Sequence, residues 1–436
     1  MNDEADDEVS AELVSEGLTG GASLPGHVYL HVPFCRSKCS YCDFASVAGA
    51  SDQQAAAVFE AMRAEVRRWS ASGLPGVVDT IYVGGGTPSF LAAETTRLLD
   101  VSTRQLPVRD GAEITVEANP DSFDIATAEG FARAGATRVS LGVQSFDDSV
   151  LKILGRPHDA EKAAVAAAAA LGAGLDLSVD LMCGVPGQSL ASWQETLDRA
   201  VRSGAGHVSV YPLSVEEGTP LAVAVDAGLI EAPDPDDAAT MMTLAGEILG
   251  RAGLTRYEVA NYARPGKESR HNTGYWTGRS YLGIGPAAHG MLDAETARAL
   301  GVIAGEDAEA GRDAGPDAFG RRRESRAVAR TQDVASIDEV ARVRYGNTPE
   351  VEAWLFGEQW EIELLTVSEA AREDVMLGLR MTRGVPVGQV DRAGLTPVLR
   401  DLAGLGLTEE ADGRWRTTRR GWLLGNEVFS RVWAGQ

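Results

Sequence analysis

The sequence predicts an α/β fold in which a parallel sheet curves into a partial (β/α)6 barrel, followed by a smaller, mostly helical domain. Two observations support this. Short β-rich runs alternate with helical runs between about residues 27 and 215, and helical patterns dominate from about residue 335. Strands that alternate with helical patterns imply βαβ units and a parallel sheet, with an open doubly wound sheet as the alternative. The six predicted strands are 27–32, 78–83, 113–117, 138–143, 177–182 and 207–211.

Helical patterns fill the gaps between these strands, for example at 53–69 and 160–171, and a further helix is predicted at 236–252. Near the C-terminus, apolar strips at 369–381 and 387–405 predict helices. A hairpin at 407–417, turning at Asp412-Gly413, and a final helix follow. The order helix, helix, hairpin predicts a winged-helix-like domain.

Composition divides the chain into four segments. Residues 1–25 are expected to form a flexible tail, because the first 24 residues carry seven acids and no Lys or Arg. Residues 26–290 hold the barrel and its extension. Residues 291–334, rich in Ala, Gly, Asp, Glu and Arg without periodicity, are expected to be an irregular insertion, and residues 335–436 form the C-terminal domain.

Charge and hydropathy restrict the classes of partner. The chain has 436 residues, of which 44% are hydrophobic, and a formal net charge of −23. Such a field repels phosphate backbones and anionic lipid, so neither nucleic acid nor a membrane surface is an expected partner. The acidic start is unlike a secretory signal, and the longest apolar run, 163–175, is too short to span a bilayer. We therefore expect a cytoplasmic protein.

Three of the four cysteines lie within eight residues, as Cys35-x3-Cys39-x2-Cys42. Three thiolates can hold three irons of a 4Fe–4S cluster and leave the fourth iron open to a small molecule. A Cys3His zinc site that uses His31 is an alternative, as is a loop without metal. A disulfide would strand one of the three, and the distant Cys183 is expected to be a small core residue.

Polar residues and glycines follow the other predicted strands. Since active sites lie at the carboxyl ends of barrel strands, these residues are expected to meet at one rim. For each residue taken alone, a tight turn or a solvated surface group is the simpler explanation. The rim residues are Cys35 after strand one, Gly84–Pro88 after strand two, Glu117, Gln144, Asp180 and Ser214. Arg156, like Gln144 and Asp180, could hydrogen-bond a ribose or a carboxylate.

The motifs resemble those of radical S-adenosylmethionine (SAM) enzymes, and more narrowly the oxygen-independent coproporphyrinogen III oxidase family. The resemblance extends from about residue 27 to the end of the chain. It rests on Tyr29-Leu-His-Val-Pro-Phe-Cys35 with the two later cysteines, Gly84-Gly-Gly-Thr-Pro-Ser89 and Gly142-Val-Gln-Ser-Phe146. It implies a radical-SAM barrel in which Cys35, Cys39 and Cys42 bind the cluster and SAM chelates the open iron. The residues that it implies around SAM are Tyr29, Tyr41, Gly85, Gly86, Thr87, Glu117, Gln144, Arg156, Asp180 and Ser214.

Two features favour the heme chaperones of this family over the oxidase. The oxidase resembles Cys-x3-Cys-x2-Cys-x-Cys, whereas this chain has Phe44 at the last position. The segment His271-Asn272-x2-Tyr275-Trp276 resembles the heme-binding motif of the chaperones, which lack the oxidase activity. From the residues alone, an Asn-containing turn with two core aromatics is the alternative. Physically, an imidazole can ligate iron and broad rings can pack on a macrocycle.

The resemblance therefore implies a chaperone that binds heme and delivers it to an acceptor protein, with a respiratory protein of the membrane as the expected class of acceptor. The electron donor for the cluster cannot be read. The rival functions are oxidative decarboxylation of coproporphyrinogen III and a radical reaction on another substrate. His289, in the Gly-rich segment 283–290, is a minor candidate on a loop, whereas His158 and His207 are expected to be structural.

Overall fold

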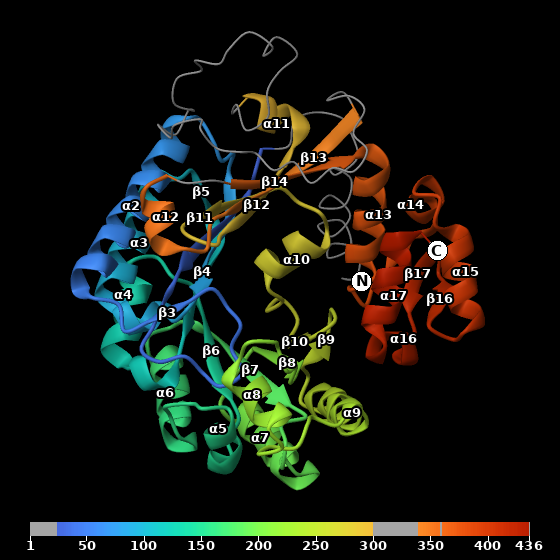
Figure 1. The fold of residues 1–436 in the computed structure, drawn as a ribbon, viewed down its shortest axis with the longest axis horizontal. Coiled ribbons are helices and arrows are strands. Elements are labelled where there is room, and N and C mark those ends of the chain that lie inside the picture. Colours follow the sequence, from blue (N-terminus) through green and yellow to red (C-terminus); the bar gives the residue numbers. More distant parts are fainter. Residues whose placement is uncertain (1–23, 300–338, 358–359, 436) are drawn as a thin grey trace, which may run out of the picture.

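The computed structural model describes residues 24–299, 339–357 and 360–435. Its centre is a twelve-stranded sheet of order β14-β13-β12-β11-β1-β4-β5-β6-β7-β8-β10-β9, which curves around an inner space (Figure 1). All six predicted strands are present and neighbouring pairs are parallel, so the partial-barrel prediction is confirmed. They are β1 (His27–Val32), β4 (Val78–Gly85), β5 (Val108–Ala118), β6 (Arg138–Gln144), β7 (Asp176–Cys183) and β8 (His207–Pro212).

Helices cover the outer face of these strands (Figure 1). Their N-termini are defined by side-chain caps: Ser51, Asp124, Asp159 and Ser189 each accept a hydrogen bond from a backbone N–H in the first turn. The 160–172 segment buries alanines at every turn, and these small side chains let the helix lie close to the sheet. The outer helices are α2 (Asp52–Ala71), α3 (Ala92–Gln105), α4 (Ile125–Arg133), α5 (Asp148–Ile153), α6 (Ala160–Gly172) and α7 (Leu190–Arg202).

Each barrel strand separates an apolar outer face from a polar inner face, as the two-residue period of a strand requires. On β1, Val28 and Leu30 are fully buried among the outer apolar residues. On the inner face, side chains hydrogen-bond across neighbouring strands instead. These pairs are His27–Thr80, Tyr82–Glu117, Ser140–Asp180, Ser209–Asp180 and Ser178–His207. The inner space of the barrel is therefore lined by polar groups, and its walls are held by cross-strand bonds.

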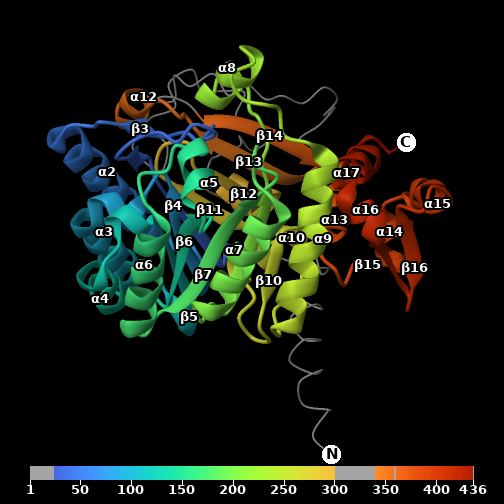
Figure 2. The ribbon, with the colours of Figure 1, turned by 90° about the horizontal axis from the view of Figure 1, so that it is seen from below.

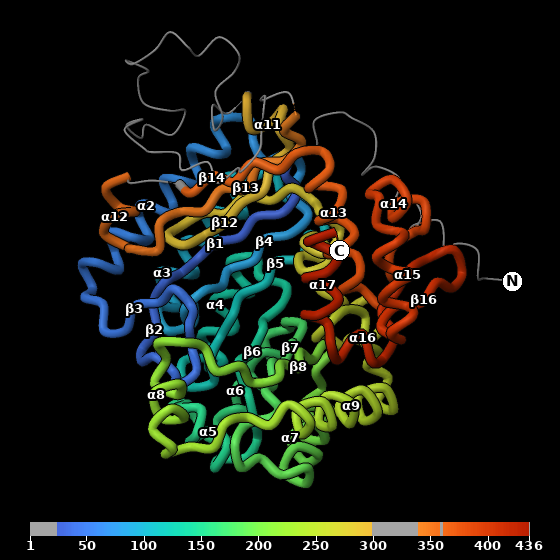
Figure 3. Tube along the Cα trace, turned by 45° about the vertical axis from the view of Figure 1, so that its right-hand side comes forward, coloured from blue at the N-terminus to red at the C-terminus, as the bar shows by residue number. Residues whose placement is uncertain are grey.

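Beyond β1 the sheet continues with strands that the sequence analysis did not predict. The strand β11 (Tyr281–Ile284) runs parallel to β1, and β12 (His289–Asp293), β13 (Val340–Asn347) and β14 (Trp360–Thr366) follow antiparallel (Figure 3). The expectation of helical structure from residue 335 was wrong for β13 and β14. Arg342 and Arg344 alternate with apolar residues along β13, and both form ion pairs with Glu373.

The predicted irregular insertion, 291–334, begins inside this sheet. Its first residues complete β12 and form the helix α11 (Ala294–Ala299), and residues 300–338 lie outside the described part of the chain. The same holds for residues 1–23 of the predicted acidic tail. The short helix α12 (Val351–Leu355) connects β13 and β14.

At the opposite edge, α8 (Pro220–Asp226) and α9 (Pro235–Arg251) precede the short strands β9 (Thr255–Arg256) and β10 (Asn261–Ala263). The helix α10 (Arg270–Trp276) then crosses to the inner side of the sheet, where it contacts β4. The small strands β2 (Phe34–Cys35) and β3 (Val47–Ala48) bracket the loop that carries the cysteines.

The C-terminal region is mostly helical, as predicted, and lies to one side of the barrel (Figure 2). It has an apolar cluster of its own. The predicted 387–405 helix is two helices, because Gly394 takes a left-handed conformation (φ +70°) between them. The predicted hairpin is present as β16 (Thr408–Ala411) and β17 (Arg414–Thr417), to which β15 (Val385–Pro386) adds. The helices are α13 (Val367–Gly378), α14 (Val387–Arg392), α15 (Thr396–Gly404), α16 (Arg419–Leu423) and α17 (Gly425–Ala434).

This region is fixed to the barrel by specific polar contacts. The Trp422 indole N–H donates to the Val259 carbonyl at 2.7 Å, and the Arg256 guanidinium lies 4.1 Å from the centre of the Trp422 ring. Cation–π contacts of this kind add to the apolar area that they cover. Within the described residues, no helix is both long enough and apolar enough to cross a membrane.

Replacing a core leucine of β1 is expected to reduce stability strongly. Leu30 is fully buried between β4 and β11, so Leu30→Ala should lower the free energy of unfolding by about 2–5 kcal/mol. The matched control is Leu229→Ala, since Leu229 is 79% exposed and its loss should cost less than about 0.5 kcal/mol. Denaturant unfolding of both variants measures the difference, and equal effects would contradict the assigned core.

Candidate functional site

The loop that carries Cys35, Cys39 and Cys42 is pinned to the turn after α5. The Ser40 N–H donates to the Leu154 carbonyl at 3.2 Å, and the Ser40 hydroxyl donates to the Ile153 carbonyl at 2.8 Å. The turn itself requires Gly155, whose φ is +66° and whose missing Cβ would lie 3.0 Å from the Ser40 nitrogen. All three cysteines are free thiols, as metal ligation requires.

Two of the sulfurs receive hydrogen bonds from groups at the strand ends. The Thr87 hydroxyl donates to the Cys35 sulfur at 3.3 Å, and the Arg156 guanidinium donates to the Cys39 sulfur at 3.2 Å. Burial raises the pKa of the Cys35 thiol, and the hydrogen bond from Thr87 opposes that shift. A buried guanidinium favours a thiolate beside it, which is the form that binds iron.

Asn119 connects these two donors and was missed by the sequence analysis. Its amide N–H donates to the Thr87 hydroxyl at 3.1 Å, while its amide oxygen accepts from Arg156 at 2.6 Å. Arg156 also donates to the Gly142 carbonyl at 2.8 Å. Its position in the sequence could have identified it as a site residue, since Asn119 follows β5 as closely as Thr87 follows β4. We name this set, Thr87, Asn119 and Arg156, the thiol clamp.

The structure argues against the zinc alternative. Both ring nitrogens of His31 are engaged, Nδ1 with the Tyr29 hydroxyl at 3.0 Å and Nε2 with the Ala45 carbonyl at 2.9 Å. Across the described ranges, no three His, Cys, Asp or Glu side chains come close enough together to hold one metal ion. Three separated thiols instead fit a cluster, in which each sulfur binds a different iron.

The glycines of the Gly84–Thr87 segment are required because other parts of the chain approach their backbone closely. A Cβ at Gly84 would lie 2.9 Å from the Glu117 carboxyl, and a Cβ at Gly86 would lie 2.7 Å from the Phe34 carbonyl oxygen. Gly85 has a φ of +110°, and its N–H donates to a Glu117 oxygen at 3.1 Å. The segment thus brings β4 against both the cysteine loop and the Glu117 carboxyl.

Two acids lie on the inner wall of the barrel. Burial raises the pKa of Glu117 to about 7, although hydrogen bonds from the Tyr82 hydroxyl (2.8 Å) and the Gly85 N–H oppose that shift. Burial also raises the pKa of Asp180, against hydrogen bonds from Ser209 and Ser140. Buried carboxyls with perturbed pKa values are typical of binding sites.

The remaining predicted rim residues lie near this wall but not together. Gln144 has a left-handed backbone (φ +63°) at an irregularity of the β6–β7 ladder, a strain typical of functional positions. Tyr41 packs beside an apolar cluster that includes Leu154 and Leu213. Ser214 is exposed beyond the end of β8, so it is the least enclosed of the predicted residues.

A cavity of about 790 Å³ opens at this end of the barrel. Four predicted residues line it: Tyr29, Gly85 and Glu117 from the SAM set, and Tyr275 from the heme set. The exposed Phe44 belongs to the same wall. The volume is in the range of ligand and cofactor sites, and the lining mixes aromatic rings with a few polar groups, as such sites do. Residues from both predicted sets therefore line one cavity.

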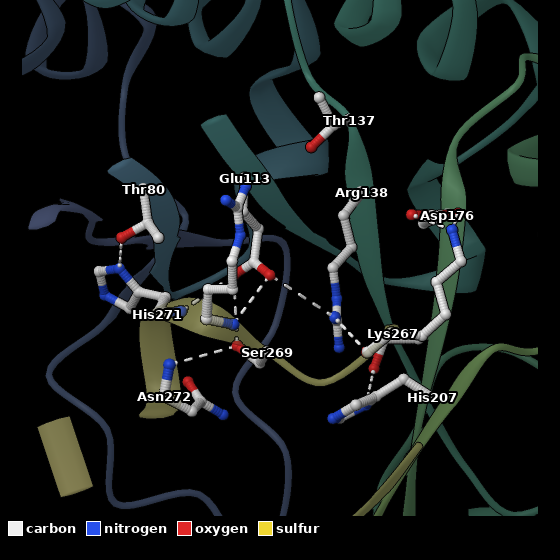
Figure 4. A network of polar contacts seen from close by, with 12 residues as sticks. Thr80, Glu113, Thr137, Arg138, Asp176, His207, Lys267, Ser269, His271 and Asn272 are labelled. Atoms are coloured by element: carbon white, nitrogen blue, oxygen red, sulfur yellow. Dashed lines mark hydrogen bonds and ion pairs between the residues drawn. The ribbon is translucent and has the colours of Figure 1, made fainter. Parts of the chain in front are cut away.

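The helix α10, which carries His271 to Trp276, is held by a buried carboxylate (Figure 4). Glu113 on β5 accepts hydrogen bonds from the backbone N–H groups of Arg270 (2.9 Å) and His271 (3.1 Å). Arg138 on β6 lies 3.9 Å from Glu113 and donates to the Lys267 carbonyl. A carboxylate at a helix N-terminus is favourable, because it satisfies unpaired N–H groups.

The structure places His271 differently from the expected iron ligand. Its side chain is 1% exposed, Nδ1 hydrogen-bonds the Thr80 hydroxyl at 2.7 Å, and Nε2 hydrogen-bonds the Tyr275 hydroxyl at 2.9 Å. Burial holds its pKa well below the usual value, so the ring is neutral. Neither nitrogen is open to an iron ion in this structure. The ring instead supports Tyr275, whose side chain faces the cavity.

The other two residues of the motif lie apart from the cavity. The Asn272 backbone N–H donates to the N-cap hydroxyl of Ser269 at 3.2 Å, and Trp276 lies against the C-terminal region, with the Arg380 guanidinium 5.1 Å from its ring centre. Trp276 therefore contributes to the contact between barrel and C-terminal region.

Comparisons with known proteins agree with this geometry. The family model of the Radical SAM superfamily matches residues 29–200 of the chain, and the family model of the HemN C-terminal domain matches residues 365–424. By fold, coproporphyrinogen III oxidase (HemN) from Escherichia coli matches with a TM-score of 0.70 and 19% identity, covering 94% of this chain and 90% of that one. These findings define a radical SAM protein with a HemN-type C-terminal region.

Curated relatives narrow the assignment. Heme chaperone HemW of Mycobacterium tuberculosis is 36% identical over 94% of this chain and 96% of its own length. Heme chaperone HemW of Bacillus subtilis is 32% identical over 92% of this chain and 97% of its own length. The chain belongs to the heme chaperone HemW family of radical SAM proteins.

The raised pKa of Glu117 predicts a pH dependence of stability. Between the ordinary value of 4.5 and about 7, the unfolded chain releases this proton while the folded chain keeps it. The contribution to stability is therefore fully present at low pH and is lost as pH rises through this window. Glu117→Gln should make the decline of unfolding free energy between about pH 5 and pH 8 shallower, as denaturant titrations would measure.

The control for this experiment is Glu161→Gln, since Glu161 is exposed on α6. A decline with the parent's slope in Glu117→Gln would contradict the buried, protonated state of this carboxyl.

Proposed function

We propose that this chain is a heme chaperone: it binds a 4Fe–4S cluster through Cys35, Cys39 and Cys42, binds SAM beside it, and carries heme to an acceptor protein. The observation that supports this best is the shared cavity. Residues expected around SAM (Tyr29, Gly85 and Glu117) and the heme-motif residue Tyr275 line the same space. One protein could thus couple cluster and SAM occupancy to the binding of a macrocycle.

The chemistry of the cysteine loop supports the cluster. Soft thiolates select iron–sulfur clusters over hard cations, and hydrogen bonds to the sulfurs tune the potential of such clusters. The thiol clamp supplies such bonds to Cys35 and Cys39. When bound, a cluster with one open iron would supply the electron for reductive cleavage of SAM, and the residues of this chain would orient and shield the cofactor.

The inner wall of the barrel supports the SAM site. The SAM residues Gly86, Gln144, Asp180, Tyr41 and Ser214 are proposed in addition to those that line the cavity. Glu117 and Asp180 offer carboxyl oxygens to hydroxyl or ammonium groups, and the Gly84–Gly86 backbone permits close approach of a ligand.

The names of the curated relatives support heme as the bound and transferred molecule. The curated relatives of similar length are named heme chaperones, and Phe44 stands where the oxidase pattern has its fourth cysteine. We propose heme as the cargo, with a cytoplasmic location and a respiratory protein of the membrane as the acceptor class. His271, Asn272, Tyr275 and Trp276 are proposed to form the heme site together, with Tyr275 in the cavity wall and the other three supporting it.

The cluster assignment predicts which cysteines matter. Cys39→Ala should abolish most bound iron and acid-labile sulfide after anaerobic reconstitution, because the cube loses one of three protein ligands. Cys183→Ala is the matched control: Cys183 is fully buried in the apolar core and should not affect iron content. Zinc without labile sulfide in the parent, or iron loss equal in both variants, would contradict the cluster.

The chaperone assignment predicts binding without porphyrin turnover. The reconstituted chain should bind hemin with a defined absorption spectrum and, on mixing, lose it to an apo-heme protein. With coproporphyrinogen III, SAM and a reductant, it should form no protoporphyrinogen. Steady multiple-turnover formation of protoporphyrinogen would instead establish the oxidative decarboxylase, which is the rival function.

A further inference from the structure

The histidines of this chain differ in whether they can accept a metal. There are six, all within the described ranges: His27, His31, His158, His207, His271 and His289. The first five are buried, and each has at least one ring nitrogen in a hydrogen bond. His31 also lines the cavity, but both of its ring nitrogens are engaged. His27 Nε2 and His158 Nδ1 have no hydrogen-bond partner within the part of the chain that the structure describes, but neither residue lines the cavity. His289 is exposed, has no hydrogen-bond partner among the described residues, and lines the 790 Å³ cavity.

The sheet builds a recess around His289. It is the first residue of β12 rather than a loop residue, and its partner in the β12–β13 register is Gly346, which in turn pairs with Glu361 on β14. A Cβ at Gly346 would lie 2.7 Å from His289 Cε1, so the imidazole lies over a glycine that leaves it room. His289, Gly346 and Glu361 all line the cavity.

The turn before His289 is held in an uncommon conformation. Ala287 has a φ of +58° and Gly285 a φ of +100°. The Asn347 amide donates to the Gly285 carbonyl at 2.6 Å, and the Ala287 N–H donates to the Thr348 carbonyl at 3.0 Å. A non-glycine residue in this region costs free energy that the surrounding contacts must offset, and such strain gathers at ligand sites. The turn determines where β12 begins and therefore where the imidazole lies.

Aromatic rings complete the surroundings of a planar ligand. Tyr275, Tyr281 and Phe44 line the same cavity, with the Tyr275 and Tyr281 ring centres 4.6 Å apart. Phe44 is 64% exposed, an apolar surface that a macrocycle would cover.

We propose that His289 would hold the heme iron through its imidazole, and that His271 is a positioning residue that holds Tyr275 in the cavity wall. This inference rests on the proposed heme-binding function and assigns the iron to a residue outside the His271–Trp276 motif. The same cavity offers the rings of Tyr275, Tyr281 and Phe44 to a planar ligand, and it also contains the SAM residues Tyr29, Gly85 and Glu117.

The test compares the same substitution at two histidines in the full chain. His289→Gln and His271→Gln are reconstituted with the 4Fe–4S cluster, so that the thiolates are occupied, and titrated with hemin. The ligation of ferric heme is read from the Soret band and from electron paramagnetic resonance. His289→Gln should lose the imidazole signature and weaken hemin binding by about tenfold or more, the size of effect typical of disturbed metal sites.

His271→Gln should keep the imidazole signature, because its ring is not the ligand. Retained imidazole ligation in His289→Gln, together with its loss in His271→Gln, would overturn the assignment while the proposed function stands. A parent chain that binds no hemin would refute the proposed function and the assignment with it.

Added imidazole distinguishes the loss of the His289 ligand from misfolding of the variant. In His289→Gly, added imidazole should restore the parent spectrum, which a merely structural role would not allow. SAM affinity, measured on the same variants, should be unchanged in His289→Gln. A selective loss of SAM affinity with intact heme ligation would assign His289 to SAM and overturn the proposal.

Discussion

The buried guanidinium of Arg156 is the contact on which the geometry of the site depends. A charge removed from water needs partners, and this one has three: the Cys39 sulfur, the Asn119 amide oxygen and the Gly142 carbonyl. Those partners belong to the cysteine loop, the end of β5 and the strand β6. Through Asn119 the same network reaches Thr87 and the Cys35 sulfur. Parallel strands end at one edge, so a single cation can join the loop to several strands.

A second buried charge, the carboxylate of Glu113, also joins separate elements of the barrel. Glu113 holds the N-terminus of α10, and Arg138 lies beside it. That helix supports Tyr275 through His271 and leads to Trp276, which contacts the C-terminal region through Arg380. The wall of the cavity is thus linked mechanically to the C-terminal region. The His271–Trp276 segment therefore contributes Tyr275 to the cavity wall and Trp276 to the contact with the C-terminal region.

Most of the barrel was predictable because its signals are local. Short β-rich runs and the helical patterns between them identified all six parallel strands. Thr87 and Glu117, which were predicted from strand ends, lie beside the Cys35 sulfur and in the cavity wall, and Arg156 contacts the Cys39 sulfur. Asn119 was missed, although it lies within the segment that was considered, because an amide gives no signal of its partners. The strands β13 and β14 were missed for another reason. The strand β13 pairs with β12 from about 50 residues earlier in the chain, and β14 pairs with β13, so neither strand belongs to a local β-helix-β repeat.

The histidines show most clearly which features the sequence determines by itself and which depend on the tertiary structure. The spacing of Cys35, Cys39 and Cys42 and the His271–Trp276 pattern were enough to identify the class of protein, because ligand spacing on one loop is a property of adjacent residues. Whether an imidazole nitrogen is free is decided by groups from other strands. Thr80 and Tyr275 occupy both nitrogens of His271, whereas Gly346 leaves room beside His289. Contacts between residues that are distant in the chain form only when the sheet closes, so only the tertiary structure decides which histidine presents a free ring nitrogen to the cavity.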